Sequence, residues 1–116
     1  METVLIVDDH AGFRSLARRI LVAEGFDVVG EVGSGVLALE SARRLRPQIV
    51  LLDIQLPDLD GFEVARRLAE ERLCTATVLI SSRDSTAYRR RLKDSPALGF
   101  IPKGKLSGAA LAELVG

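Results

Sequence analysis

The chain has 116 residues and carries 16 basic and 16 acidic side chains, so its formal net charge is zero. This length predicts one compact domain over residues 1–116, and a hydrophobic fraction of 47% argues against disorder. The single cysteine, Cys74, excludes an internal disulfide and a cysteine-based zinc site. The sequence has no membrane-length apolar run and no basic region at its N-terminus, so we expect a cytoplasmic protein without membrane contact.

Charge is divided unevenly along the chain. Residues 1–60 hold six basic and ten acidic residues, whereas residues 61–116 hold ten basic and six acidic ones. The second half includes a dense basic run, made of Arg89, Arg90, Arg91 and Lys93. Such a run is either a solvated helix face or a docking surface, and the sequence leaves both interpretations open.

Five short apolar runs are spaced along the chain and are rich in β-branched residues. They comprise residues 4–7, 28–32, 49–52, 78–80 and 98–101. Their length and composition are typical of strands buried on both faces of a parallel sheet.

Helical patterns separate these runs. Apolar residues at positions 13, 16, 17, 20 and 21 share one face of a first helix, which Gly25 ends. Further helices are predicted from about residue 34 to just before Pro47, and over 62–69, 84–94 and 106–115, the last with Ser107 as its N-cap. This alternation predicts an α/β fold with a parallel sheet covered by helices on both faces.

Polar side chains follow four of the five predicted strands at their carboxyl ends. They are Asp8, Asp9 and His10, then Asp53, then Ser81 and Ser82, and finally Lys103. Ligands of open parallel sheets bind outside the carboxyl ends of the strands, so we expect these side chains to converge at one edge.

Such a set of side chains favours phosphoryl chemistry. Three carboxylates repel one another unless a cation joins them, and Mg²⁺ accepts carboxylate, water and phosphate oxygens. A lysine binds phosphate as a point charge, a serine hydroxyl donates to a phosphoryl oxygen, and a carboxylate can itself be the nucleophile. The residues therefore predict an Mg²⁺-assisted phosphoryl acceptor.

The chain resembles the receiver domain of two-component response regulators over nearly its whole length. The matching stretches are residues 4–10, 49–61, 78–82 and 99–103. Two features are similar to those of receivers joined to LuxR-type helix-turn-helix domains. One is the Asp-Asp-His sequence after the first strand, and the other is the spacing of Asp53 from Ser81 (28 residues) and from Lys103 (50 residues). Gly104 follows the lysine where many receivers have a proline.

The resemblance implies a role for each matching residue. Asp53 would be the phosphoacceptor, assisted by Lys103 and Ser81. Asp8, Asp9, Asp53 and the backbone carbonyl of Gln55 would hold Mg²⁺. Ser81 and Phe100 would be the switch residues that respond to phosphorylation.

The resemblance also implies a fold and partners. The fold would be a flavodoxin-like doubly wound five-stranded parallel sheet, order 2-1-3-4-5, with five helices. The phosphodonor would be a sensor histidine kinase, and the chain would assist its own phosphorylation and dephosphorylation without being an enzyme. The face formed by the fourth helix, fifth strand and fifth helix would serve as a homodimer or output contact, with DNA bound only through a domain absent from this chain.

Other interpretations remain beside this one. A phosphorylation-independent pseudo-receiver would keep the fold as an interaction module. A haloacid-dehalogenase-type phosphatase also uses an aspartyl phosphate, but it needs Asp-x-Asp where this chain has adjacent Asp8 and Asp9. Asp58 and Asp60 are predicted to be turn residues rather than metal ligands. His10 is a possible ligand, although a position at the start of the first helix is favoured.

Overall fold

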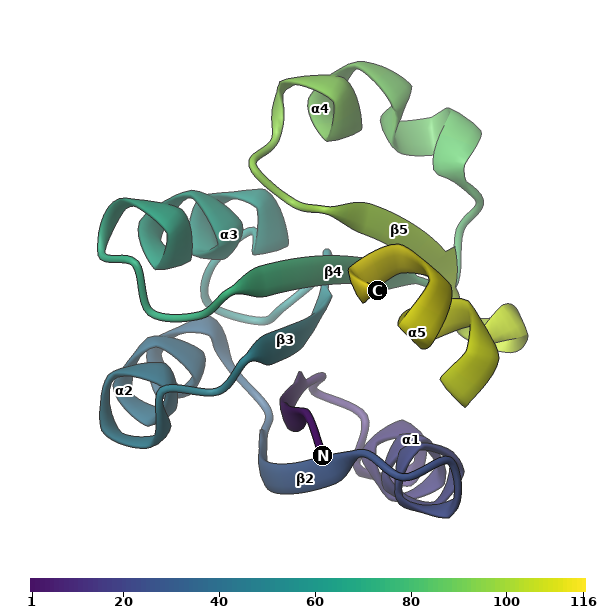
Figure 1. Ribbon diagram of the computed structural model, residues 1–116. Helices are drawn as coiled ribbons and strands as arrows, with labels where there is room; N and C mark the ends of the chain where they lie inside the picture. The colour runs from purple at the N-terminus through teal and green to yellow at the C-terminus, as the bar shows by residue number, and fades with distance from the viewer.

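The computed structural model describes all 116 residues as a parallel sheet between two layers of helices (Figure 1). The strands are β1 (Thr3–Val7), β2 (Asp27–Val32), β3 (Ile49–Asp53), β4 (Ala76–Ser81) and β5 (Gly99–Pro102). They pair in the order β2-β1-β3-β4-β5, and every pair is parallel. The predicted strand order is confirmed.

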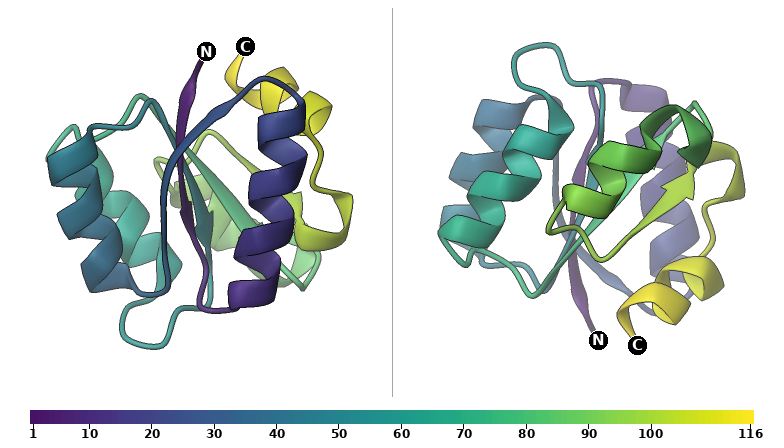
Figure 2. Two further views of the ribbon diagram at one scale, coloured as in Figure 1. Left: turned by 90° about the horizontal axis from the view of Figure 1, so that it is seen from below. Right: turned by 90° about the horizontal axis from the view of Figure 1, so that it is seen from above.

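Five α-helices connect and follow the strands. They are α1 (Ala11–Ala23), α2 (Gly35–Leu45), α3 (Gly61–Glu70), α4 (Arg89–Asp94) and α5 (Gly108–Val115). Helices α1 and α5 cover one face of the sheet, and α2, α3 and α4 cover the other (Figures 1 and 2). None of them is both long enough and apolar enough to cross a bilayer.

The central strands are buried on both faces, which explains their continuous apolar runs. Because side chains alternate along a strand, β1 contributes to two cores. Leu5 and Val7 pack beneath the layer that contains α2 and α3, whereas Val4 and Ile6 pack beneath α1 and α5. The edge strand β5 is only partly buried.

Three helices begin at a side chain that accepts a backbone N–H of the first turn. Ser34 accepts from Leu37 at 3.2 Å, Asp60 from Phe62 at 2.7 Å and Ser107 from Ala110 at 3.0 Å. The predicted N-cap at Ser107 is confirmed. Gly25, with φ of +94°, follows the end of α1 as predicted, because glycine tolerates this backbone conformation.

The structure corrects some details of the predicted helices. Residues 84–94 form two elements, a 3₁₀ turn over Ser85–Tyr88 and then α4, because Tyr88 departs from helical dihedral angles (φ −125°, ψ 11°). Leu16, predicted to share a helix face with positions 17 and 21, is exposed, whereas Ala17 and Leu21 are buried. Leu98 is also exposed, and β5 begins one residue later than predicted.

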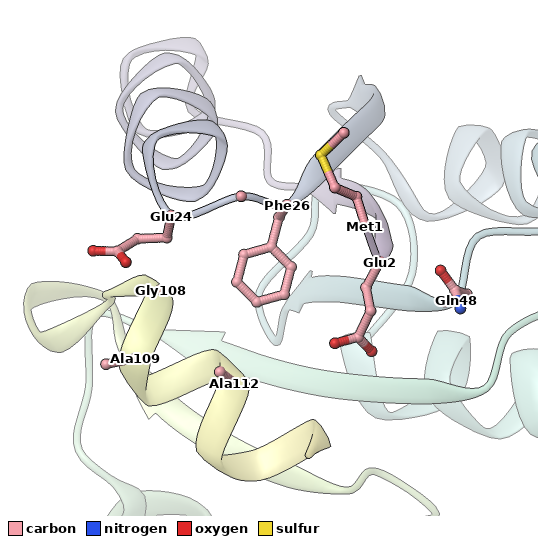
Figure 3. A pocket seen from close by; sticks show the side chains of 9 residues that line it. Met1, Glu2, Glu24, Phe26, Gln48, Gly108, Ala109 and Ala112 are labelled. Carbon is pink, nitrogen blue, oxygen red and sulfur yellow. The ribbon is translucent and has the colours of Figure 1, made fainter.

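Both termini lie at the end of the molecule opposite to the β3–α3 loop (Figure 2). A hollow of about 480 Å³ opens at that end, between the start of β1, the α1–β2 turn and α5 (Figure 3). Glu2 and Glu24 are among its lining residues, which include no Lys, Arg, Ser or Cys. The predicted acidic residues Asp8 and Asp53 lie at the opposite end of the sheet, at the carboxyl ends of β1 and β3.

Candidate functional site

Three of the predicted acidic residues meet at the carboxyl ends of β1 and β3. Asp8 directly follows β1 and Asp53 is the last residue of β3, and both are almost completely buried. Asp9 and His10 are exposed beside them. Potential ligand atoms of all four residues lie within 4.8 Å of one another. The predicted convergence of Asp8, Asp9 and Asp53 is therefore present in the structure.

Lys103 directly follows β5 and joins the two buried carboxylates. Its Nζ lies 2.5 Å from Asp8 Oδ2 and 3.2 Å from Asp53 Oδ2. The ammonium also sits 4.8 Å from the centre of the Phe13 ring on α1, a cation–π contact that shields it from water. One cation thus spans the carboxyl ends of three strands.

The electrostatics of the site depend on burial. Burial raises the pKa of Asp53, with a further contribution from the Asp8 carboxylate, and this outweighs the hydrogen bond from Gln55 and the charge of Lys103. Burial acts to lower the pKa of Lys103, but its contacts with Asp8 and Asp53 outweigh this effect and raise that pKa. An additional cation would relieve the repulsion between the carboxylates.

The donor set fits a hard cation such as Mg²⁺. The cluster offers three carboxylates, and this ion prefers oxygen ligands. Asp8 Oδ2 is buried, and no donor reaches it apart from the Lys103 ammonium. The backbone N–H of Gln55 donates to Asp53 Oδ1 at 3.1 Å, which fixes the loop that carries the predicted Gln55 carbonyl.

His10 lies where it was predicted, at the N-cap position of α1. Its backbone N–H donates to Asp8 Oδ1 at 2.8 Å, and its Nδ1 is 3.1 Å from both Asp8 Oδ1 and Asp9 Oδ1. The imidazole is mostly exposed and therefore borders the cluster on its solvent side.

Sequence reasoning missed the support beneath Asp8. Arg14 of α1 donates to the backbone carbonyl of Asp8 at 2.7 Å, and its Nε lies 3.4 Å from Glu31 on β2. A Cβ at Gly33 would come within 3.2 Å of the Arg14 guanidinium. The helical spacing of Arg14 gave no signal for this contact, because its partners lie on other elements.

The β3–α3 loop passes close behind Asp53. A Cβ at Gly61 would lie 2.4 Å from the Asp53 carbonyl oxygen, so only glycine fits there. Asp58 and Asp60 lie outside the ligand cluster. Both cap helices: Asp60 begins α3, and Asp58 accepts from the backbone N–H groups of Gly35 and Val36 at the start of α2.

Ser81 is buried at the end of β4. Asp53 pairs in register with Ile80, so Ser81 lies one residue further toward the carboxyl edge. Its Oγ accepts the backbone N–H of Arg83 at 3.1 Å and lies 3.4 Å from the Tyr88 hydroxyl. Ser82 is exposed, and Phe100 of β5 is half-buried with its ring centre 6.4 Å from that of Tyr88.

The basic run lies within α4, on its exposed surface. Arg91 pairs with Asp60 at 2.6 Å and lies 4.3 Å from the centre of the Phe62 ring. Arg89, Arg90 and Lys93 are exposed and form no salt bridge within the chain. The helix thus presents cationic groups that the fold itself does not neutralise.

Comparison with known proteins agrees with this geometry. Residues 4–114 match the family model described as the response regulator receiver domain. The chain is 39% identical over 100 residues to the transcription regulator BvgA of Bordetella pertussis, covering 86% of this chain and 48% of BvgA. It is 35% identical over 116 residues to the response regulator GacA of Pseudomonas viridiflava, covering 99% of this chain and 52% of GacA.

A solved structure is also similar. The signal receiver domain of NarL from Mycobacterium tuberculosis superposes with a TM-score of 0.87 at 33% identity, covering 99% of this chain and 97% of that domain. The chain spans about half the length of the curated relatives described above. From its fold, its carboxyl-edge cluster and these matches, the chain belongs to the response regulator receiver domain family of two-component systems.

Proposed function

We propose that this chain is a phosphorylation-controlled switch whose acceptor is Asp53. The observation that carries the proposal is the buried Asp53 carboxylate at the end of β3, which contacts Lys103 and lies beside Asp8. A buried carboxylate pair is unfavourable unless cations compensate it. The cluster therefore suits a site where a phosphoryl group adds negative charge and nearby cations neutralise it.

Asp8, Asp9, Asp53 and the Gln55 backbone carbonyl would hold Mg²⁺, as the acidic donor set favours. The ion would supply charge neutralisation for the incoming phosphoryl group. An Asp53 oxygen forms the new P–O bond while the bond from phosphorus to the donor breaks, and the departing group keeps that electron pair. Lys103 and the Ser81 hydroxyl would contact the phosphoryl oxygens.

The donor would be a sensor histidine kinase, and the setting would be the cytoplasm. BvgA is named as a transcription regulator, which supports transcription regulation as the output of this chain. DNA would be bound through a separate domain. The face of α4, β5 and α5 would serve as the homodimer or output contact, and its unneutralised basic residues support that assignment. The domain, taken as residues 1–116, would act on its own Asp53 and on no separate substrate.

The test is adduct formation with beryllofluoride or acetyl phosphate in Mg²⁺. We expect an Asp53-dependent mass increase after acetyl phosphate treatment, and a change in the emission of Tyr88, the only tyrosine in a chain without tryptophan. Asp53→Asn should abolish both signals. Asp58→Asn is the matched control, because Asp58 lies in the same loop but outside the cluster.

A phosphorylation-independent interaction module is the alternative. This alternative is favoured if the wild-type chain forms no adduct but remains folded and binds a partner through the face of α4, β5 and α5. An adduct that persists in Asp53→Asn would contradict the assignment of the acceptor.

A further inference from the structure

Tyr88 anchors an otherwise exposed segment. Between Ser82 and Asp94 it is the one buried residue, with 8% of its surface exposed. Its ring lies between Phe62 of α3 and Phe100 of β5, at centroid distances of 6.0 Å and 6.4 Å. Packing alone would explain a phenylalanine at this position, so the hydroxyl needs a separate explanation.

The Tyr88 hydroxyl has one partner, Ser81 Oγ, at 3.4 Å. This separation exceeds the roughly 2.7–2.8 Å of a strong hydroxyl pair, so the contact is loose in this state. Ser81 has one proton and two lone pairs, and the Arg83 backbone N–H occupies one lone pair. One proton and one lone pair remain for every other partner of Ser81.

We propose that Tyr88 is a positioning residue, whose hydroxyl donates to Ser81 and directs the Ser81 proton toward a phosphoryl group on Asp53. This inference rests on the proposed function. Once Ser81 donates to a phosphoryl oxygen, only its free lone pair faces further partners. Tyr88 must then be the donor, and hydrogen bonds that run in one direction strengthen one another.

The same contact ties the site to α4. Tyr88 immediately precedes Arg89, the first residue of α4, and closes the 3₁₀ turn before it. A tighter bond from Tyr88 to Ser81 would draw the start of α4 toward the site. Phe100, the switch residue implied by the resemblance, has no hydroxyl and cannot make this bond, so Tyr88 supplies the hydrogen bond and Phe100 supplies packing.

The chain offers a direct spectroscopic test because Tyr88 is its only tyrosine. In Raman spectra, tyrosine gives two neighbouring ring bands, the Fermi doublet. The ratio of their intensities distinguishes a hydroxyl that donates a hydrogen bond from one that accepts. We expect this ratio to move toward the donor form when beryllofluoride and Mg²⁺ are added to the wild-type chain. Ser81→Ala should remove the shift, because the acceptor is gone.

A second variant tests the effect on rate. Tyr88→Phe keeps the ring and removes only the hydroxyl, and we expect phosphorylation by acetyl phosphate to slow about two- to tenfold, as for the loss of one hydrogen bond. Phe100→Leu, which leaves the hydroxyl in place, should keep the Raman shift. Denaturation curves of the unphosphorylated wild type and of Tyr88→Phe show whether a slower reaction reflects only a less stable fold.

The outcomes separate the two proposals. A wild-type chain that forms no Asp53 adduct would overturn both together. An adduct that leaves the tyrosine doublet unchanged, or that shifts it equally in Ser81→Ala, would overturn the role of Tyr88 alone. A Tyr88→Phe variant that is phosphorylated at the wild-type rate would do the same.

Discussion

Helices α3 and α4 lie on the same face of the sheet but are held there in opposite ways. Helix α3 buries Val64, Ala65 and Leu68 in the core, and its arginines Arg66 and Arg67 pair with glutamates of the same helix. Helix α4 has no buried residue, and most of its charges have no partner. Helix α3 is fixed by its buried side chains, whereas α4 is held by only a few contacts.

This difference shows where a change at the carboxyl edge can be transmitted. Segments with few buried apolar contacts open at a lower free energy than the core does. Helix α4 is connected to the rest of the molecule through the Tyr88 ring, the half-buried Leu92 and the pair of Arg91 with Asp60. We therefore expect a change in hydrogen bonding at Ser81 to affect α4 more than α3.

Truncation of one leucine in each helix should separate α3 from α4 most clearly. Leu68→Ala should lower the free energy of unfolding by about 2–5 kcal/mol, because it leaves a cavity in a fully buried site. Leu92→Ala should cost about 1 kcal/mol or less, because Leu92 is only half-buried. Urea denaturation measures both losses, and equal losses would contradict the contrast between the helices.

Amide hydrogen exchange shows which helices each leucine substitution destabilises. Leu92→Ala should speed exchange within α4 and leave α3 unchanged. Leu68→Ala should speed exchange across the whole domain, since it weakens the common core.

Asp58 links the β3–α3 loop to the start of α2. Asp58 accepts from Val36 and Gly35 at 2.9 Å and 2.7 Å, and these hydrogen bonds lower its pKa below the ordinary value. Asp58→Ala should cost about 1 kcal/mol at neutral pH, the typical value of a lost N-cap.

The pH dependence of this loss follows from the sign of the shift. A carboxyl group whose pKa is lower in the folded state stabilises the fold above its unfolded pKa of about 3.9. That stabilisation disappears as the pH falls through the lower, folded value. Denaturation curves of the wild type and Asp58→Ala should therefore converge in strong acid. Asp58→Asn, which caps without titrating, should show no comparable change, and a constant gap for Asp58→Ala would contradict the role of the charge.

The sheet and its acidic cluster were predictable from sequence for one physical reason. Strands buried on both faces read as continuous apolar runs, so Asp8 and Asp53 stood out as charges at their ends. Parallel topology then brought those ends together. Lys103 was found by the same reasoning, fifty residues from Asp53.

The contacts that support the site were not predictable, because they join elements far apart in sequence. Asp58 caps a helix that begins 23 residues earlier, and Arg14 holds the Asp8 carbonyl from the next helix. Tyr88 falls within the helix predicted over residues 84–94, and only the fold places its hydroxyl beside Ser81. Local patterns report which residues are buried, and they do not report the partners of polar atoms.

Removal of a single surface charge from α4 should change the stability of the fold least. Arg90 has no acidic partner, so Arg90→Gln should change the free energy of unfolding by no more than about 0.5 kcal/mol. Arg66→Gln is the matched change on α3. Hydrogen bonds from Arg66, and then from Arg67, lower the pKa of Glu63 to about 2. Arg66→Gln removes the ion pairs that Arg66 makes with Glu63 and Glu70.

Arg66→Gln should therefore destabilise the fold more than Arg90→Gln does, and added salt should reduce the difference because exposed charges are screened. Denaturation of both variants at low and high salt measures this. If Arg90→Gln were the more destabilising change, the α4 charges would already be engaged within the chain, and α4 would no longer be a free basic surface. If its stability is unchanged, the positive charge of Arg90 contributes nothing to folding and stays available for an acidic partner surface.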